Sequence, residues 1–130
     1  MDAGALTIHE AAATSGWSPR MLRYIEESGL VVPERSASGY RLFGPAELQR
    51  LRTLRELLDG FGVELAEMGF ARRLREDPGL RHAVDAWFAA LPVRPPGVSP
   101  PDWLAYEQEK HLQLLALAGS AAGAGFQEEK

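Results

Sequence analysis

The sequence predicts a mainly α fold, a winged helix-turn-helix of four helices and a small two-stranded wing, followed by a short C-terminal helical region. Three observations carry this prediction. Two short capped helices flank a glycine-containing turn near the N-terminus, a turn-rich segment with strand-like ends follows them, and leucines at helical spacing come next. The order of these parts is that of a helix-turn-helix with a wing.

The first helix is predicted from its two ends. Thr7 and Glu10 form a capping box, in which each side chain satisfies a backbone N–H of the other residue. The Ala-rich turn that follows leads to Gly16, where the helix is expected to end.

The second helix carries both a start and a stop signal. Ser18 can accept a backbone N–H at the N-cap, Pro19 fits the first helical position, and Gly29 can adopt the left-handed conformation that ends a helix. Apolar residues at helical spacing define the face that packs, namely Met21, Leu22 and Ile25. The other faces carry Arg20, Arg23, Tyr24 and Glu27.

The wing is predicted over residues 31–42. Val31 and Val32 have strand character, residues 36–39 are turn-forming, and residues 40–42 alternate as a returning strand does. Beyond the wing, a leucine stripe predicts a third helix, with Leu48, Leu51, Leu54, Leu57 and Leu58 on one face.

As an ordered set, these motifs resemble the DNA-binding domain of the MerR family of bacterial transcription regulators. The matching positions are Ser18, Pro19, Leu22, Arg23, Tyr24, Glu26, Glu27, Gly29, Leu30, Ser38, Gly39, Tyr40, Arg41 and Leu42. Residues 45–48 resemble the start of that family's third helix, and residues 62–68 resemble the segment that opens its fourth. The resemblance covers residues 6–75, so we expect a DNA-binding domain over residues 1–76.

The resemblance also shows departures. Ile25 stands where most relatives have a second aromatic residue, so one backbone contact of the family is expected to be missing. Trp17 replaces an aliphatic residue ahead of the cap, and we interpret it as a turn residue packed on the helix pair rather than as a DNA contact.

Residues near the start of a recognition helix are best placed to reach base edges in the major groove. The candidate DNA-binding residues of the chain are therefore Ser18, Arg20, Arg23, Tyr24, Arg35, Tyr40 and Arg41. The resemblance implies that Arg23 and Tyr24 contact DNA, although a guanine and a phosphate are both open as the partner of Arg23. The wing residues are expected over the flanking backbone or the minor groove. The alternative for Arg41 is a solvated strand residue paired with Glu34.

The net charge of −4 is divided unevenly along the chain. Residues 18–55 contain seven arginines against four acids, whereas residues 77–130 contain four basic residues against seven acids. Because the local field steers a polyanion, a mildly acidic chain can still bind duplex DNA through an arginine patch. Arg50, Arg52 and Arg55 lie on the third helix, and we expect only some of them to face DNA.

Several classes of function are excluded by what the sequence lacks. The chain has no cysteine, so we expect no disulfide, thiolate metal site or iron–sulfur cluster, and a soft-metal sensor of the family type is disfavoured. His9, His82 and His111 lack ligand spacing, so neither a metal nor a cofactor is expected. No apolar run approaches the roughly 20 residues of a membrane span, and no signal peptide is evident, so we expect a cytoplasmic protein without a membrane partner.

An enzyme is not expected either. The sequence shows no Gly-rich phosphate loop, serine elbow or paired-carboxylate site. We interpret Glu26 and Glu27 as a solvated helix end.

Residues 77–118 are predicted to be a helical dimerisation or effector region. Asp77, Pro78 and Gly79 end the fourth helix and cap a fifth of about 12 residues, which stops at a Pro-rich linker over residues 92–101. A further helix is expected from about Pro101 to Gly119, followed by a flexible tail over residues 119–130. The candidate dimer or ligand residues are Val84, Trp87, Phe88, Trp103 and Tyr106. A packed core or dimer contact is favoured for the aromatic members over a ligand pocket or a protein-docking surface.

The leading hypothesis is a sequence-specific transcription regulator of MerR type that binds promoter DNA as a homodimer. The resemblance implies that it distorts DNA so that RNA polymerase can engage both promoter elements. An unidentified small-molecule effector is a further candidate partner. The short fifth helix favours an alternative, an effector-free or architectural module on direct repeats, like BldC-like and excisionase-like proteins. A third hypothesis is a protein-interaction adaptor that retains the winged fold.

Overall fold

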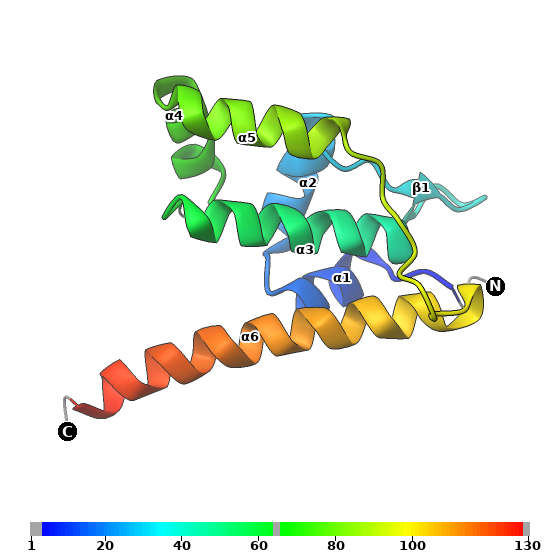
Figure 1. The fold of residues 1–130 in the computed structure, drawn as a ribbon. Helices are drawn as coiled ribbons and strands as arrows, with labels where there is room; N and C mark the ends of the chain where they lie inside the picture. The colour runs from blue at the N-terminus through cyan, green and yellow to red at the C-terminus, as the bar shows by residue number, and fades with distance from the viewer. Residues whose placement is uncertain (1–3, 64–65, 129–130) are drawn as a thin grey trace.

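The computed structural model describes residues 4–63 and 66–128, without the side chains of residues 67 and 118–128. Its helices and strands are arranged as Figure 1 shows. In chain order they are α1 (Ile8–Ser15), α2 (Pro19–Glu27), β1 (Glu34–Arg35), β2 (Arg41–Leu42), α3 (Pro45–Gly60), α4 (Glu67–Glu76), α5 (Pro78–Ala89), the 3-10 turn η1 (Pro100–Asp102) and α6 (Trp103–Glu128). The predicted class, mainly helical with a two-stranded wing, is confirmed.

The caps predicted for the helix-turn-helix are present. The Glu10 backbone N–H donates to Thr7 Oγ1 over 3.2 Å, and the Thr7 N–H donates to Glu10 Oε1 over 2.8 Å. Gly16 ends α1 with a φ of 78°, which is left-handed and therefore suits glycine. Ser18 caps α2 by accepting the Met21 N–H over 3.0 Å. Local sequence signals thus determine both ends of the turn.

The buried face of α2 is also the predicted one. Met21, Leu22 and Ile25 are each 1% exposed and belong to a core that extends into α1, α3 and α5. Trp17 is 2% exposed within the same core, in agreement with its interpretation as a packed turn residue. The recognition helix is therefore fixed in orientation by side chains that DNA cannot reach.

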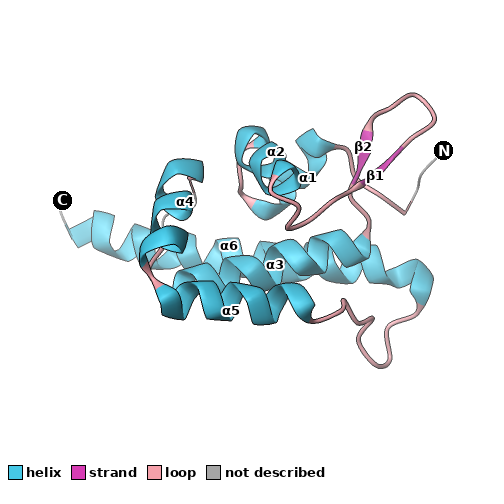
Figure 2. Ribbon diagram, turned by 90° about the horizontal axis from the view of Figure 1, so that it is seen from above, coloured by secondary structure: helices cyan, strands magenta, loops and turns pink. Residues whose placement is uncertain are grey.

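The wing differs from the prediction in its outgoing strand. The antiparallel ladder joins Glu34 and Arg35 to residues 41–42, with Arg35 opposite Arg41. Assigning the outgoing strand to Val31 and Val32 was wrong, because Val31 is buried in the core and the following Pro33 has no N–H for a ladder. Figure 2 shows the hairpin projecting from the helices.

The fourth and fifth helices start and stop close to the predicted positions. Asp77 lies between α4 and α5, where its side chain accepts the Leu80 N–H over 3.1 Å. This hydrogen bond is the main cause that lowers the pKa of Asp77. In the segment that resembles the opening of the family's fourth helix, Glu64 and Leu65 lie outside the described residues.

The last helix is longer than predicted. It runs past Gly119 to Glu128, and both views show its C-terminal part extending beyond the other helices. Its N-terminal part packs along α3 and α1. The flexibility of residues 119–130 stays a prediction, and residues 129–130 lie outside the described part.

Candidate nucleic-acid interface

A cleft of about 370 Å³ separates the recognition helix from the wing. The residues around it come from the start of α1, the middle of α2 and both sides of the hairpin. They are Thr7, Ile8, His9, Arg23, Arg35, Gly39, Tyr40 and Arg41. Four of the seven predicted DNA-binding residues, Arg23, Arg35, Tyr40 and Arg41, therefore lie around one cavity.

The hairpin turn sets the position of Tyr40. Ser36 holds the turn through its backbone N–H, which donates to the Tyr40 carbonyl, and through its Oγ, which accepts the Tyr40 N–H over 3.1 Å. Gly39 has a φ of 90°, a conformation that a side chain would strain. The Tyr40 side chain is 71% exposed at the rim of the cleft, where it is open to a ligand.

Glu26 joins the recognition helix to the wing. Its carboxylate accepts a hydrogen bond from Arg35 Nη2 over 3.0 Å and another from Arg41 Nε. The alternative pairing of Arg41 with Glu34 is thus not the one formed. The interpretation of Glu26 as a solvated helix end was also wrong, because its side chain is only 14% exposed.

The two arginines determine the ionisation of this carboxyl group. Burial alone would raise the pKa of Glu26, but the hydrogen bonds and charges of Arg41 and Arg35 outweigh burial and lower it. Glu26 therefore stays negatively charged over a wider pH range than an isolated glutamate.

The remaining predicted DNA residues, Ser18, Arg20 and Tyr24, are not among those that line the cleft. Ser18 is exposed at the start of α2, where it serves as the N-cap, and Arg20 is exposed one turn before Tyr24. Tyr24 is half-buried, with its ring edge-on to Phe70 at 6.2 Å between centroids. It lines a second cavity of about 460 Å³ between α2, α4 and α5, with Ala71, Leu74, Arg75, Arg81 and Asp85.

The arginines of α3 make contacts inside the chain. Arg50 donates to the carbonyls of Trp87 and Phe88 over 3.0 and 3.2 Å, and also to that of Ala90, where α5 ends. Burial lowers the pKa of Arg50.

The other two arginines of α3 hold neighbouring helices. Arg52 Nε lies 3.1 Å from the fully buried Glu107 of α6, and Arg55 donates to the Ser15 carbonyl at the end of α1 over 2.6 Å. The α3 arginines thus join α5, α6 and α1 to the central helix.

The C-terminal candidates divide between core and surface. Val84 and Trp87 are 3% and 9% exposed in the chain's own core, and Trp87 Nε1 donates to Thr53 Oγ1 over 2.8 Å. Trp103 is half-buried and donates to Glu107 over 2.9 Å. Tyr106 is half-buried, while Phe88 is 53% exposed.

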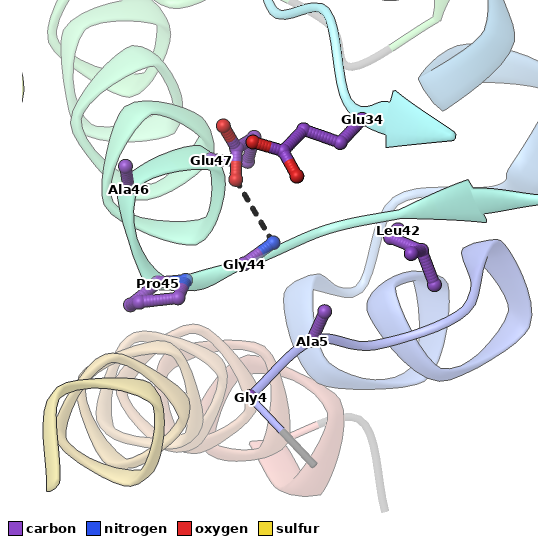
Figure 3. Close-up of a pocket in the computed structure, with 8 residues that line it drawn as sticks. All are labelled: Gly4, Ala5, Glu34, Leu42, Gly44, Pro45, Ala46 and Glu47. Atoms are coloured by element: carbon purple, nitrogen blue, oxygen red, sulfur yellow. Dashed lines mark hydrogen bonds between the residues drawn. The ribbon is translucent and has the colours of Figure 1, made fainter. Parts of the chain in front are cut away.

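A third cavity, of about 380 Å³, lies at the base of the wing (Figure 3). It is lined by Gly4, Ala5, Glu34, Leu42, Gly44, Pro45, Ala46 and Glu47. Glu47 accepts the Gly44 N–H over 2.9 Å, and the side chain of Glu34 extends toward it in Figure 3. Two carboxylates beside a cavity disfavour a phosphate there, so we do not assign this cavity to DNA.

The part of the chain that the structure describes contains neither a metal-binding cluster nor a membrane-spanning helix. No group of three or more histidine, aspartate or glutamate side chains is placed to hold a metal ion. None of the helices combines the length and the apolar character that crossing a membrane requires.

The capped helix pair, the hairpin and the basic cleft between them define a winged helix-turn-helix protein. The family model described as "MerR HTH family regulatory protein" matches residues 6–69. The HTH-type transcriptional regulator CueR of Salmonella typhimurium is 32% identical over 127 residues, which cover 91% of this chain and 83% of that protein. The chain therefore belongs to the MerR family of helix-turn-helix regulatory proteins.

Other relatives match a smaller part. The HTH-type transcriptional regulator HmrR of Sinorhizobium medicae is 44% identical over 61 residues, 45% of this chain and 42% of that protein. The heavy metal-dependent transcription regulator 2 of Rhizobium meliloti matches with the same identity and the same coverage. The aligned region thus covers less than half the length of each of these two proteins. No solved structure matches the chain.

Proposed function

We propose that this chain is a DNA-binding transcription regulator that binds duplex promoter DNA through α2 and the wing. The observation that carries the proposal is the convergence of Arg23, Arg35, Tyr40 and Arg41 on one cleft. Arginines on an exposed helix face can bind guanine or phosphate, and wing arginines can bind the flanking backbone. Such a regulator acts where the promoter is, in the cytoplasm.

The charge of the interface supports binding as a homodimer. Of the seven arginines in residues 18–55, Arg50, Arg52 and Arg55 make contacts inside the chain. The four others are matched in number by the four acids of this segment. One subunit therefore offers few cations to a polyanion, and two subunits on a palindrome would double the number of contacts.

Phe88 is the member of the predicted dimer set that the structure leaves most exposed. Leu112 and Leu117 on α6 are also exposed, at 54% and 69%. We propose that a second copy covers apolar surface of this C-terminal region, whereas Val84 and Trp87 serve the subunit's own core.

The family resemblance supports distortion of the promoter as the mode of action, with RNA polymerase as the second partner. Bending or twisting a duplex costs on the order of 1 to 6 kcal/mol, which contacts from two linked subunits would have to offset. An unidentified small-molecule effector would act by favouring one of the two DNA shapes.

The shortness of α5 favours one competing function, an effector-free module that assembles on direct repeats. At 12 residues, α5 is about 18 Å long. A helix of this length is too short to hold the DNA-binding domains of two subunits apart by pairing with its copy alone. The two functions predict different numbers of chains per duplex. A palindrome binds one dimer, whereas direct repeats bind a series of monomers.

The test is the solution mass of the chain with and without the duplex from upstream of its own gene, measured by light scattering. The proposal predicts two chains per duplex, and a Phe88→Ser variant that is monomeric in the absence of DNA. One chain per repeat would support the module instead, and no complex at all would contradict DNA binding. Wild-type mass for Phe88→Ser would remove Phe88 from the dimer contact.

A further inference from the structure

Among the residues that the structure describes, Glu26 is the one acidic residue in contact with both wing arginines lining the cleft. Its two oxygens are divided between them, since Oε2 accepts from Arg35 and Oε1 from Arg41. Arg35 and Arg41 are directly opposite each other in the ladder. A single carboxylate on the recognition helix therefore fixes one side chain on each strand of the wing.

The ladder alone provides little to hold the wing. Each strand has two residues, and an isolated two-stranded hairpin is at best marginally stable in water. Arg35 adds a second restraint, because its Nη1 donates to the Gly39 carbonyl over 3.0 Å while its Nη2 bonds Glu26. The ion pairs thus connect the hairpin turn, both strands and α2.

The contact with Arg41 uses the Nε atom. A guanidinium carries five donors in a rigid fork, so a bond at Nε does not consume its two terminal nitrogens. These two nitrogens can bind a phosphate in bidentate fashion while Glu26 holds the other edge of the group.

We propose that Glu26 is a positioning residue for DNA binding, which orients Arg35 and Arg41 toward the cleft by holding the wing on the recognition helix. The inference rests on the proposed DNA interface and adds to it a residue that does not touch DNA. Its charge has the opposite effect, because a carboxylate near the backbone repels phosphate. Positioning and charge therefore predict changes of opposite sign when Glu26 is removed.

The chain provides a matched control in Glu27. Glu27 is the next residue on α2, carries the same charge and is exposed. Glu26→Ala and Glu27→Ala remove the same charge from neighbouring positions of α2. Only the first removes the bonds to Arg35 and Arg41.

The experiment measures the affinity of the full chain for the duplex upstream of its own gene and for an unrelated duplex of equal length. We expect Glu26→Ala to weaken binding to both duplexes by about fivefold, because a phosphate contact is made on any sequence. Glu27→Ala is expected to leave both affinities unchanged or to tighten both complexes. In an Arg35→Ala/Arg41→Ala background, Glu26→Ala should cause no further weakening.

If Glu26→Ala tightens both complexes as Glu27→Ala does, the proposal is overturned, because Glu26 then acts as a charge alone. Weakening by Glu26→Ala that persists undiminished in the Arg35→Ala/Arg41→Ala background also overturns it, because the loss then does not act through the two arginines. Far-ultraviolet circular dichroism of each variant verifies that the helices are intact. Arg23→Ala separates the two proposals: weaker binding by this variant with no weakening by Glu26→Ala would retain the interface and reject the positioning role.

Discussion

Two sets of arginines in this chain serve different purposes. In the first set, Arg23, Arg35 and Arg41 line an open cleft between α2 and the wing. In the second, Arg50, Arg52 and Arg55 bond to backbone carbonyls or to the buried Glu107 inside the chain. The residue type is the same, and the two sets lie fewer than ten residues apart at their closest approach in the sequence.

The difference shows what decides the role of a basic residue. The arginines of α3 pack against α5, α6 and the end of α1, whereas Arg23, Arg35 and Tyr40 at the cleft are exposed. An arginine beneath other helices satisfies carbonyls that would otherwise remain unpaired at helix ends. Counting arginines along the sequence therefore overstates the field that DNA would experience.

The largest loss of stability is expected at the buried ion pair between α3 and α6. Replacing Arg52 by alanine leaves the fully buried Glu107 without its cation, so we expect the free energy of unfolding to fall by about 3 kcal/mol. Urea denaturation measures this loss. Arg23→Ala is the control, since an exposed arginine should change the stability by less than about 0.5 kcal/mol. Equal losses in both variants would break the distinction between the two sets.

A smaller loss of stability is expected at the contact between α5 and α3. Trp87→Phe keeps most of the buried ring but removes the hydrogen bond to Thr53, which should cost about 1 kcal/mol of stability. In a double-mutant cycle, Thr53→Val should cost less in the Trp87→Phe background than alone. Strict additivity would show that this bond does not hold α5 in place.

The smallest expected effect is a dependence of the stability on pH, caused by His111. This side chain is 1% exposed and contacts the Leu48 carbonyl over 2.7 Å. Burial lowers its pKa from the ordinary value of 6.5, with Arg52 and Arg55 acting in the same direction and the Leu48 carbonyl and Glu107 against it. The folded chain therefore binds this proton less readily than the unfolded chain.

The sign of the pH effect follows from linkage. The contribution of the neutral His111 is fully present above pH 6.5 and is lost as the pH falls below that value toward the lowered pKa. Urea melts between pH 7.5 and 5 should show falling stability, and His111→Gln should reduce the slope. A His111→Gln variant with the wild-type slope would assign the pH dependence to other groups.

The sequence predicted well what depends on neighbouring residues. The capping box of Thr7 and Glu10, the N-cap at Ser18, the left-handed Gly29 and the buried face of α2 are all decided within one or two turns. The class of fold followed from the order of such local signals. Val31 was misassigned because its strand propensity was outweighed by burial in the core.

What could not be predicted depends on contacts between distant residues. Glu26 and Arg41 are 15 residues apart, and Arg52 and Glu107 are 55 apart. Helical spacing shows which side chains share a face, but it does not show which element covers that face. For this reason Glu26 was interpreted as solvated, and the contacts of the α3 arginines inside the chain were not predicted.

The most direct test of the two arginine sets is the salt dependence of binding to the duplex upstream of the chain's own gene. Each phosphate contact contributes about 0.9 to the slope of log affinity against log salt concentration. The account predicts a slope shallower by about 0.9 for Arg23→Ala, provided that Arg23 binds a phosphate, and by a similar amount for Arg41→Ala. Arg52→Ala, measured under conditions where it is folded, should keep the wild-type slope. A wild-type affinity and slope for Arg23→Ala and Arg41→Ala, or a shallower slope for Arg52→Ala, would contradict it.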